Sequence, residues 1–305
     1  MKFNWEGVMP AVTTQFNSND ELDLDMFKVN IQAQLEAGVQ GIVLGGTLGE
    51  ASTLTEEEGR KLTRETVAIV AGKIPVLMNI AEQTTKAAIA LAKSAKEDGA
   101  SGLMMLPPMR YKASDAEIVH YFKSVANSTS LPIMIYNNPV DYKLVVTLDM
   151  FQELLDACPN IQAVKESTRD TTNITRIKNR FGNRLAIMTG VDTLALESLV
   201  LGADGWVAGL VDAFPAETVA IYTLVKAGKV QEAITIYRWF MPLLELDIHP
   251  KLVQYIKMAA VHTGIGNEYV RAPRLVLEGA ERVRIEKVIT DALAIRPTLP
   301  DYKNL

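Results

Sequence analysis

The segment Pro132-Ile-Met-Ile-Tyr136-Asn-Asn-Pro139 is the part of the sequence that says most about the fold. Its first five residues carry no charge, and such a short apolar run is typical of a strand buried on both faces of a parallel sheet. We therefore predict a strand over residues 132–137. Similar runs predict further strands over residues 7–16, 41–47, 75–80, 102–106, 161–165, 185–190 and 205–210.

Longer amphipathic segments alternate with these strands up to about residue 228. Two of them begin with capping-box spacing, Thr55 with Glu58 and Ser114 with Glu117, which predicts helix starts. Eight strands that alternate with helices favour a closed (β/α)8 barrel over an open doubly wound sheet, because such a barrel occupies about 250 residues.

Three more helical segments follow the eighth unit, over residues 230–246, 250–263 and 281–294. No low-complexity linker separates them from the preceding chain. We therefore predict an α/β protein, a (β/α)8 TIM barrel with a C-terminal helical extension. The catalytic barrel is expected over residues 1–228, and a helical region packed on it over residues 229–305.

The composition argues against several classes of protein. There are 36 acidic and 31 basic residues, giving a net charge of −5, and such a surface repels nucleic acid. The single Cys158 cannot form an internal disulfide, and residues 1–10 lack the layout of a secretion signal. No apolar run approaches the roughly 18 residues that a spanning helix needs. We expect a cytoplasmic protein that binds neither nucleic acid nor membrane.

Functional groups of a (β/α)8 barrel gather at the carboxyl ends of its strands. Lys165 stands at such an end, after the run Ile161-Gln-Ala-Val164. Desolvation favours the neutral form of an amine that emerges from a buried strand, and a neutral amine is a nucleophile near pH 7. The alternative is a lysine that reaches water or pairs with a carboxylate.

Tyr136 and Thr47 are candidates for proton transfer. Tyr136 ends the neighbouring strand, about 4.8 Å away, so its hydroxyl can approach Lys165 and shuttle protons; the alternative is a core aromatic ring. Thr47 can continue a relay from Tyr136, and glycines such as Gly46 free backbone N–H groups to bind a carboxylate. The alternative is a tight turn, because the spacing of these glycines fits neither a dinucleotide nor a P-loop motif.

Other kinds of site find less support in the sequence. His120, His249 and His262 are scattered, so we predict no metal site. Gly190 and Gly209 end the last two strand units and are candidate substrate contacts. The turns beside them can hold a phosphate in some barrels, but no arginine stands there.

Three motifs together resemble one known family. They are the turn that ends in Gly49-Glu50, the run Tyr136-Asn137-Asn138-Pro139, and the run Val164-Lys165-Glu166. In this order and near these separations they are similar to the dihydrodipicolinate synthase and N-acetylneuraminate lyase family, and the resemblance covers nearly the whole chain. It implies a barrel with a helical C-terminal region that forms a Schiff base between a lysine and a 2-oxo acid or related imine.

The resemblance also implies roles for individual residues. Lys165 matches the Schiff-base lysine, Tyr136 the proton shuttle and Thr47 the relay hydroxyl, while the backbone around Gly46 and Thr47 matches the substrate-carboxylate site. The implied partners are a small-molecule 2-oxo acid or imine carboxylate and further copies of the chain, as a homotetramer or homodimer. No metal or organic cofactor is implied, because the protonated imine is the electron sink.

Three departures from the dihydrodipicolinate synthases bear on the reaction. Those enzymes carry a second threonine where this chain has Leu48, and an arginine shortly after the tyrosine motif, where it reads Val140-Asp141-Tyr142. Their relay tyrosine, donated across a subunit interface, aligns with Arg110, although Tyr111 one place later remains a candidate. A loop absorbs an offset of one residue more easily than the loss of a bidentate guanidinium.

These departures, with the run Tyr237-Arg238-Trp239-Phe240-Met241-Pro242, are most similar to the hydroxyproline-degradation branch of the family. Enzymes of that branch deaminate 1-pyrroline-4-hydroxy-2-carboxylate to 2-oxoglutarate semialdehyde, and this is the function we predict. Asn137, Asn138 and Asp141 are then either substrate contacts or turn residues.

Other functions stay open at this point. The first alternative is 4-hydroxy-tetrahydrodipicolinate synthase, which joins pyruvate to aspartate semialdehyde, and others are a pyruvate-type aldolase or a sugar-acid dehydratase. A 2-oxo acid sensor that lacks catalysis is disfavoured, because a sensor needs neither a nucleophile nor a proton shuttle.

Overall fold

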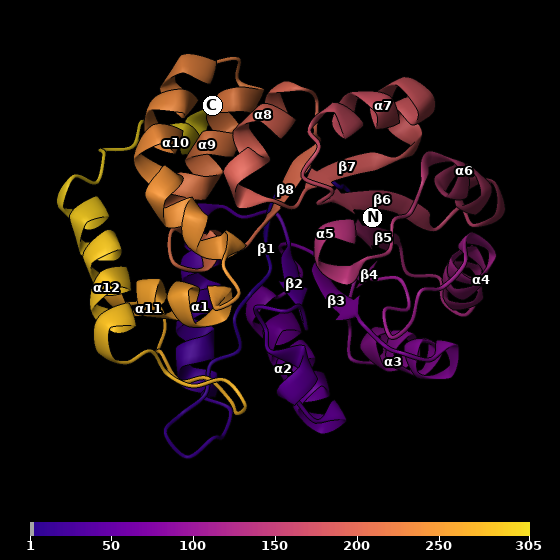
Figure 1. Ribbon diagram of the computed structural model, residues 1–305, viewed down its shortest axis with the longest axis horizontal. Coiled ribbons are helices and arrows are strands. Elements are labelled where there is room, and N and C mark those ends of the chain that lie inside the picture. Colours follow the sequence, from indigo (N-terminus) through magenta and orange to yellow (C-terminus); the bar gives the residue numbers. More distant parts are fainter. Residues whose placement is uncertain (1–2) are drawn as a thin grey trace.

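The computed structural model describes residues 3–305, so the first two residues of the predicted barrel domain lie outside the described part. Eight parallel strands form one sheet in the order β1-β8-β7-β6-β5-β4-β3-β2 (Figure 1). A bridge between Ala11 and Val43 brings the two ends of the sheet together. The predicted (β/α)8 barrel is confirmed. Its strands are β1 (Gly7–Pro10), β2 (Ile42–Leu44), β3 (Val76–Ile80), β4 (Gly102–Met105), β5 (Ile133–Asn137), β6 (Ile161–Glu166), β7 (Ala186–Thr189) and β8 (Gly205–Ala208).

Most strands are shorter than predicted, and the largest difference is at the carboxyl end of β1. That strand ends at Pro10, whereas the sequence predicted it to residue 16. The chain leaves the ladder because the Thr13 N–H donates to Asp212 Oδ2 at 2.8 Å rather than to a neighbouring strand. Every residue of β3, β4 and β8 is buried, as their apolar runs predicted.

Helices surround the barrel on its outer side (Figure 1). Both predicted capping boxes are present, since Thr55 and Ser114 accept from the backbone N–H of Glu58 and Glu117. The helices are α1 (Leu24–Ala37), α2 (Glu56–Val70), α3 (Thr85–Glu97), α4 (Asp115–Ala126), α5 (Pro139–Tyr142), α6 (Leu148–Ala157), α7 (Thr172–Phe181), α8 (Ala195–Val200), α9 (Pro215–Lys226), α10 (Val230–Leu244), α11 (Leu252–His262) and α12 (Gly279–Ala294).

The last three helices lie against the barrel helices. Helix α10 packs on α9 and α12, and Trp239 Nε1 donates to the Ala292 carbonyl at 2.8 Å. Helices α11 and α12 lie side by side (Figure 1). A 3-10 turn, Glu245–Ile248, joins α10 to α11 and brings Asp247 to the rim of the barrel. The division into a barrel up to residue 228 and a separate helical region remains a prediction.

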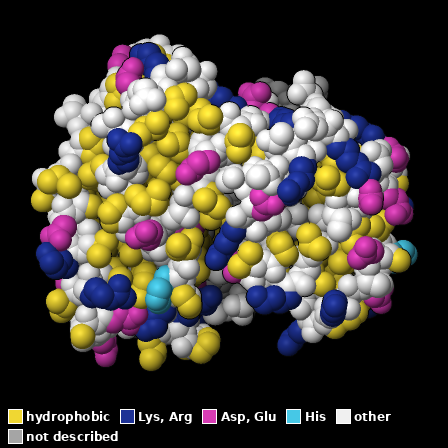
Figure 2. Space-filling view, turned by 45° about the horizontal axis from the view of Figure 1, so that its top comes forward, with side chains coloured by type: hydrophobic (Ala, Val, Ile, Leu, Met, Phe, Trp, Pro, Cys, Tyr) yellow, Lys and Arg dark blue, Asp and Glu magenta, His cyan; other side chains and the backbone are white. Residues whose placement is uncertain are grey.

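The surface is mixed in charge. On the face drawn in Figure 2, basic and acidic side chains are interspersed among apolar ones. Across residues 3–305, every helix is too short or too polar to traverse a lipid bilayer.

A buried ion pair fastens the turn after β2 to α11. Lys257 Nζ donates to Glu50 Oε1 at 2.7 Å, and both side chains are fully buried. The Arg271 N–H donates to the other carboxylate oxygen of Glu50 at 3.1 Å. Glu50 has a φ of 51°, in the left-handed region, so these contacts hold the turn in an unfavourable backbone conformation. The same turn carries Gly46 and Thr47 at its start.

We expect Lys257→Met to lower the free energy of unfolding by up to about 3–5 kcal/mol. It removes the nearest cation from the buried Glu50 carboxylate and leaves only the longer contact of 3.6 Å with Arg274 Nη1 and the hydrogen bond from the Arg271 N–H. The measurement is denaturant unfolding at neutral pH. Lys287→Met is the matched control: its exposed pair with Asp291, 2.8 Å long, is worth at most about 1 kcal/mol. Equal losses in the two variants would show that the buried pair has no special role.

Candidate active site

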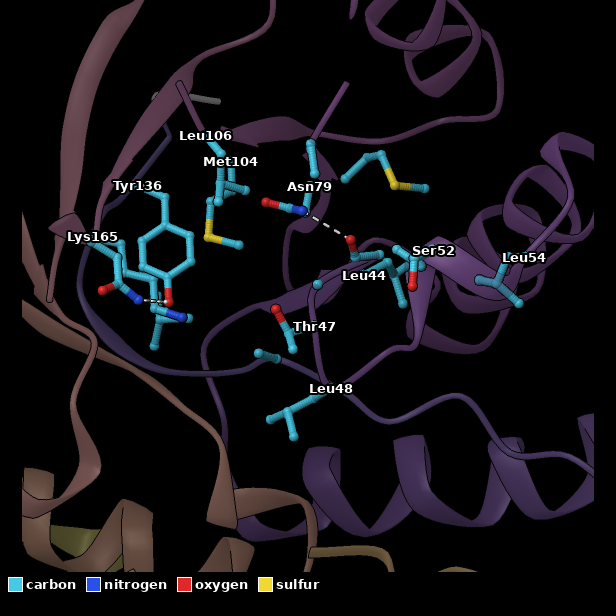
Figure 3. Close-up of a pocket in the computed structure, with 18 of the residues that line it drawn as sticks. Leu44, Thr47, Leu48, Ser52, Leu54, Asn79, Met104, Leu106, Tyr136 and Lys165 are labelled. Carbon is cyan, nitrogen blue, oxygen red and sulfur yellow. Dashed lines mark hydrogen bonds between the residues drawn. The ribbon is translucent and has the colours of Figure 1, made fainter. Parts of the chain in front are cut away.

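A cavity of about 1110 Å³ opens at the carboxyl ends of the strands and reaches between α2 and α3. We call it the mouth cavity. Figure 3 shows Tyr136 and Lys165 side by side on one wall, with Thr47 facing them. Eight of the ten predicted site residues line it: Gly46, Thr47, Tyr136, Asn138, Asp141, Lys165, Gly190 and Gly209.

Lys165 is the next-to-last residue of β6 and is paired in register with Tyr136 on β5. Its side chain is 7% exposed, and its Nζ stands 4.3 Å from the centroid of the Tyr136 ring. Burial lowers the pKa of Lys165, although nearby acids, Asp247 first among them, act in the opposite direction. Desolvation therefore favours the neutral, nucleophilic amine.

The contrast with Lys257 shows how the surroundings decide what a buried lysine can do. Both lysines are buried, and burial lowers both pKa values. Lys257 is engaged by the Glu50 carboxylate at 2.7 Å, whereas within residues 3–305 no carboxylate forms an ion pair with Lys165, which faces the mouth cavity. The alternative of a paired strand-end lysine therefore does not describe Lys165.

Gly190 and Gly209 make room for the side chains beside them. A Cβ at Gly190 would lie 2.6 Å from Lys165 Cε and 2.3 Å from Ser167 Oγ. A Cβ at Gly209 would lie 2.3 Å from Asp247 Oδ1. All three distances are far below van der Waals contact, so glycine is required where the ends of β7 and β8 approach these groups. Their predicted contacts with substrate remain a prediction.

Tyr136 is prepared to donate a proton. Burial raises the pKa of Tyr136 to about 12, so the phenol is protonated at neutral pH. Asn138 Nδ2 donates to the Tyr136 hydroxyl oxygen at 3.1 Å, which leaves the tyrosine O–H to donate elsewhere. Asn138 also donates to Asp141 Oδ2 at 2.7 Å and accepts from the Asp141 N–H.

The two asparagines of the tyrosine motif hold the backbone after β5. Asn138 is the N-cap of α5, and both hydrogens of its amide are used within the chain. Asn137 donates to the Val146 carbonyl at 3.2 Å and accepts from the Val146 N–H at 2.9 Å. Asn137 is buried and does not line the mouth cavity. For Asn137 the geometry favours the turn-residue alternative over substrate contact.

The hydroxyl of Thr47 contacts a residue that the sequence analysis did not single out. Thr47 Oγ1 lies 3.1 Å from the hydroxyl of Tyr142, not in a hydrogen bond with Tyr136. The rings of Tyr142 and Tyr136 meet edge to face, with centroids 5.8 Å apart and planes at 81°. The sequence predicted a proton transfer directly between Tyr136 and Thr47. In the structure Tyr142 lies beside both residues.

Arg169 and Asp247 are further groups at the mouth that the sequence analysis missed. Arg169, four residues after Lys165, brings its Nη2 to 3.7 Å from Asp141 Oδ1, and both side chains are about half exposed. Because Arg169 follows the carboxyl end of β6, its position in the sequence could have marked it as a candidate residue of the mouth. Asp247 comes from the turn after α10, and no local pattern marks that turn as part of the barrel mouth.

Asp247 and Asp192 are among the acidic side chains that raise the pKa of Lys165, and of these two Asp247 lines the mouth cavity. Asp192 accepts from Trp206 Nε1 at 2.9 Å and from the Leu210 N–H at 2.8 Å. Burial raises the pKa of Asp192 and also that of Asp247, well above its usual range. Within residues 3–305, no three His, Cys, Asp or Glu side chains are placed to hold a metal ion.

Tyr111 stands apart from these residues. Its side chain is 53% exposed, and it does not line the mouth cavity of its own chain. Burial of the hydroxyl and the nearby Glu117 carboxylate raise the pKa of Tyr111. Whether it reaches the site of another copy remains a prediction.

A (β/α)8 barrel with an unpaired, buried lysine at the end of its sixth strand and a phenol beside it is the arrangement of a class I lyase, which forms a Schiff base through lysine. The model described as the Dihydrodipicolinate synthetase family matches residues 4–292. The chain belongs to this family.

Individual relatives agree in fold and in name. The 4-hydroxy-tetrahydrodipicolinate synthase of Exiguobacterium sibiricum is 33% identical over 276 residues, which is 90% of this chain and 92% of that protein. The solved structure of the synthase from Methylacidiphilum fumariolicum SolV has a TM-score of 0.90 at 27% identity, covering 95% and 98% of the two chains. That of Acinetobacter baumannii dihydrodipicolinate synthase, complexed with pyruvate, has a TM-score of 0.89 at 25% identity, covering 96% and 100%. These names support the family and not the predicted deaminase branch.

We expect Gly190→Ala to lower turnover by about 100-fold, because the added methyl group displaces the Lys165 side chain from its position beside Tyr136. Steady-state kinetics measure the loss, and circular dichroism checks that the barrel remains folded. Gly59→Ala, in α2, is the control, since a Cβ there meets no atom within 4 Å. Full activity in Gly190→Ala would show that the lysine position tolerates displacement.

Proposed function

We propose that this chain is a synthase that binds pyruvate as a Schiff base on Lys165 and joins it to aspartate semialdehyde, as 4-hydroxy-tetrahydrodipicolinate synthases do. The observation that carries the proposal is the buried Lys165 amine, which faces the mouth cavity beside the Tyr136 phenol and forms no ion pair with a carboxylate of residues 3–305. The names of the relatives support this reaction over the deamination predicted from the sequence.

The first half of the reaction makes the imine. The Lys165 amine attacks C2 of pyruvate, and the former carbonyl oxygen becomes the hydroxyl of a carbinolamine. Tyr136, whose pKa of about 12 keeps it protonated, gives its proton to that hydroxyl, and water leaves. The pyruvate carboxylate is held by backbone N–H groups around Gly46 and Thr47, at the wall of the cavity opposite Lys165.

The second half makes the carbon–carbon bond. The protonated imine withdraws electrons from C3, which loses a proton to water in the mouth cavity and becomes an enamine carbon. This carbon attacks the aldehyde of aspartate semialdehyde, whose oxygen takes up a proton. The amino group of the second substrate then adds to the imine carbon and displaces the Lys165 amine, closing the ring. One molecule of water is released overall.

Arg169 is the group that we assign to the second substrate. The sequence lacks an arginine in the tyrosine motif, but Arg169 brings a guanidinium to the mouth cavity from the loop after β6. Its contact with Asp141 is a single one of 3.7 Å between exposed groups, and such a pair contributes at most about 1 kcal/mol. A substrate carboxylate can therefore replace Asp141 as its partner.

Deamination of 1-pyrroline-4-hydroxy-2-carboxylate is the second candidate, and Asp141 is the observation that favours it. This carboxylate stands at the mouth cavity within the tyrosine motif, where it would repel a second substrate carboxylate. In this reaction Lys165 adds to the cyclic imine carbon, the ring opens, and the 4-hydroxyl leaves as water. Hydrolysis then frees 2-oxoglutarate semialdehyde and ammonia, with a net consumption of one water.

The assembly and location of the protein belong to the same proposal. A homodimer or homotetramer in the cytoplasm remains our prediction, because the family is usually oligomeric. A pyruvate-type aldolase would use the same imine on Lys165 with another aldehyde. A sugar-acid dehydratase would instead form the imine with the sugar acid itself, which then loses water.

We expect pyruvate and borohydride to leave a stable adduct on Lys165 and none on Lys257. Because burial lowers the pKa of Lys165, imine formation should rise with pH and level off below the ordinary lysine value of about 10.5. Adduct formed in brief incubations from pH 7 to pH 10 is measured by peptide mass spectrometry, with Lys165→Ala as the blank. A rate that still rises at pH 10, or an adduct on another lysine, contradicts the proposal.

A direct comparison of the two reactions decides between the candidates. We expect condensation of pyruvate with aspartate semialdehyde to have the higher kcat/KM, and Arg169→Ala to raise KM for the semialdehyde by about 10-fold or more because a charge-assisted contact is lost. Ammonia release from 1-pyrroline-4-hydroxy-2-carboxylate is assayed in parallel. Higher kcat/KM for ammonia release would replace the synthase by the deaminase while leaving the Lys165 imine in place.

A further inference from the structure

The short helix α5 places one more phenol in the mouth cavity. It begins at Pro139, directly after β5, and Asn138 caps it. The Tyr142 N–H donates to the Asn138 carbonyl at 3.1 Å, and Lys143, with a φ of 62°, ends the helix after a single turn. Because α5 makes only one turn after Asn138, the Tyr142 side chain returns to a position beside Tyr136.

Tyr142 contacts Tyr136 and Thr47, the two residues of the predicted proton path. Its hydroxyl lies 3.1 Å from Thr47 Oγ1, and its ring meets the Tyr136 ring edge to face at 5.8 Å. The side chain is half-buried and lines the mouth cavity. Burial raises the pKa of Tyr142, and the neighbouring Tyr136 raises it further, while the contact with Thr47 lowers it. Neither half of the proposed reaction uses Tyr142.

We propose that Tyr142 is a proton-relay residue that returns to Tyr136 the proton that Tyr136 gives to the carbinolamine, with Thr47 as the next member. The inference rests on the proposed Schiff-base reaction. When Tyr136 has donated its proton, its phenolate takes one from the Tyr142 O–H. Tyr142 takes the proton of Thr47, and Thr47 takes one from water at the open end of the cavity. The net change is one proton moved from solvent to the departing water.

This relay is complete within one subunit. Tyr111 was the sequence candidate for a second phenol, but it is exposed and lies outside the mouth cavity of its own chain. Tyr142 supplies a phenol from the chain that also supplies Lys165, Tyr136 and Thr47. The reaction therefore does not require a hydroxyl from a neighbouring subunit.

The test compares Tyr142→Phe with Tyr111→Phe, which remove the same single oxygen from two different tyrosines. We expect Tyr142→Phe to lower kcat by about 100-fold with a smaller change in KM for pyruvate, because proton transfer typically contributes 100-fold or more. Tyr111→Phe should retain wild-type kcat. Added imidazole should restore turnover in Tyr142→Phe in proportion to its concentration, a rescue that a merely structural role of the ring would not give.

A double-mutant cycle with Thr47→Val tests whether the two hydroxyls act in one path. If they do, the double variant loses no more than the worse single variant, because breaking a relay twice is no worse than breaking it once. Losses that multiply, wild-type kcat in Tyr142→Phe, or a 100-fold loss confined to Tyr111→Phe would each overturn the relay.

The borohydride adduct with pyruvate separates this inference from the proposed function. If the wild-type enzyme and Tyr142→Phe both form the adduct on Lys165, while only the wild-type turns over at full rate, the relay is supported. If the wild-type forms no adduct, the Schiff-base function falls and the relay falls with it.

Discussion

Removing the amino group of Lys165 from water is the constraint on which the site depends. A buried ammonium ion without a partner is costly, and the cost is avoided either by pairing the charge or by losing the proton. The chain uses both solutions. Lys257 is paired with Glu50 and holds the turn after β2, while Lys165 faces a cavity and pairs with no carboxylate in the described part of the chain. The first arrangement contributes to stability, and the second favours the neutral amine that the proposed Schiff base needs.

Strand alternation was enough to predict the barrel and to place Lys165, Tyr136 and Thr47 together. All eight strands are parallel, so the residues that follow them arrive at the same end of the barrel. Strand order makes β5 and β6 neighbours, and a register shift between Ile133 and Met134 then pairs Tyr136 with Lys165. The sequence overestimated β1, because apolar residues continue past Pro10 although Thr13 bonds to Asp212 instead of to a strand. A local run of apolar residues does not reveal that the acceptor for the Thr13 N–H is the Asp212 side chain, which comes from a distant turn.

The site residues that could not be predicted from the sequence share one physical reason. Asp247 belongs to a segment whose position depends on the packing of α10 against the barrel, and Tyr142 points at Thr47 only because α5 lasts for a single turn. Arg169 is a loop residue whose own φ is 63°. In each case the direction of a side chain is decided by backbone geometry outside regular strands. Periodicity predicts which residues are near the mouth, but not which way they face.

The helix α5 links proton transfer to the charge at the mouth. Asn138 begins it and donates to the Tyr136 hydroxyl, Asp141 in its middle contacts Arg169, and Tyr142 at its end contacts Thr47. A change in the length of this turn would move all three groups at once. Lys165 stands on β6, but Tyr142 and Asp141 of α5 raise its pKa against the effect of burial. The barrel therefore positions the lysine of the proposed imine, whereas the groups that we assign to the proton relay and to the second substrate meet at the segment between β5 and α6.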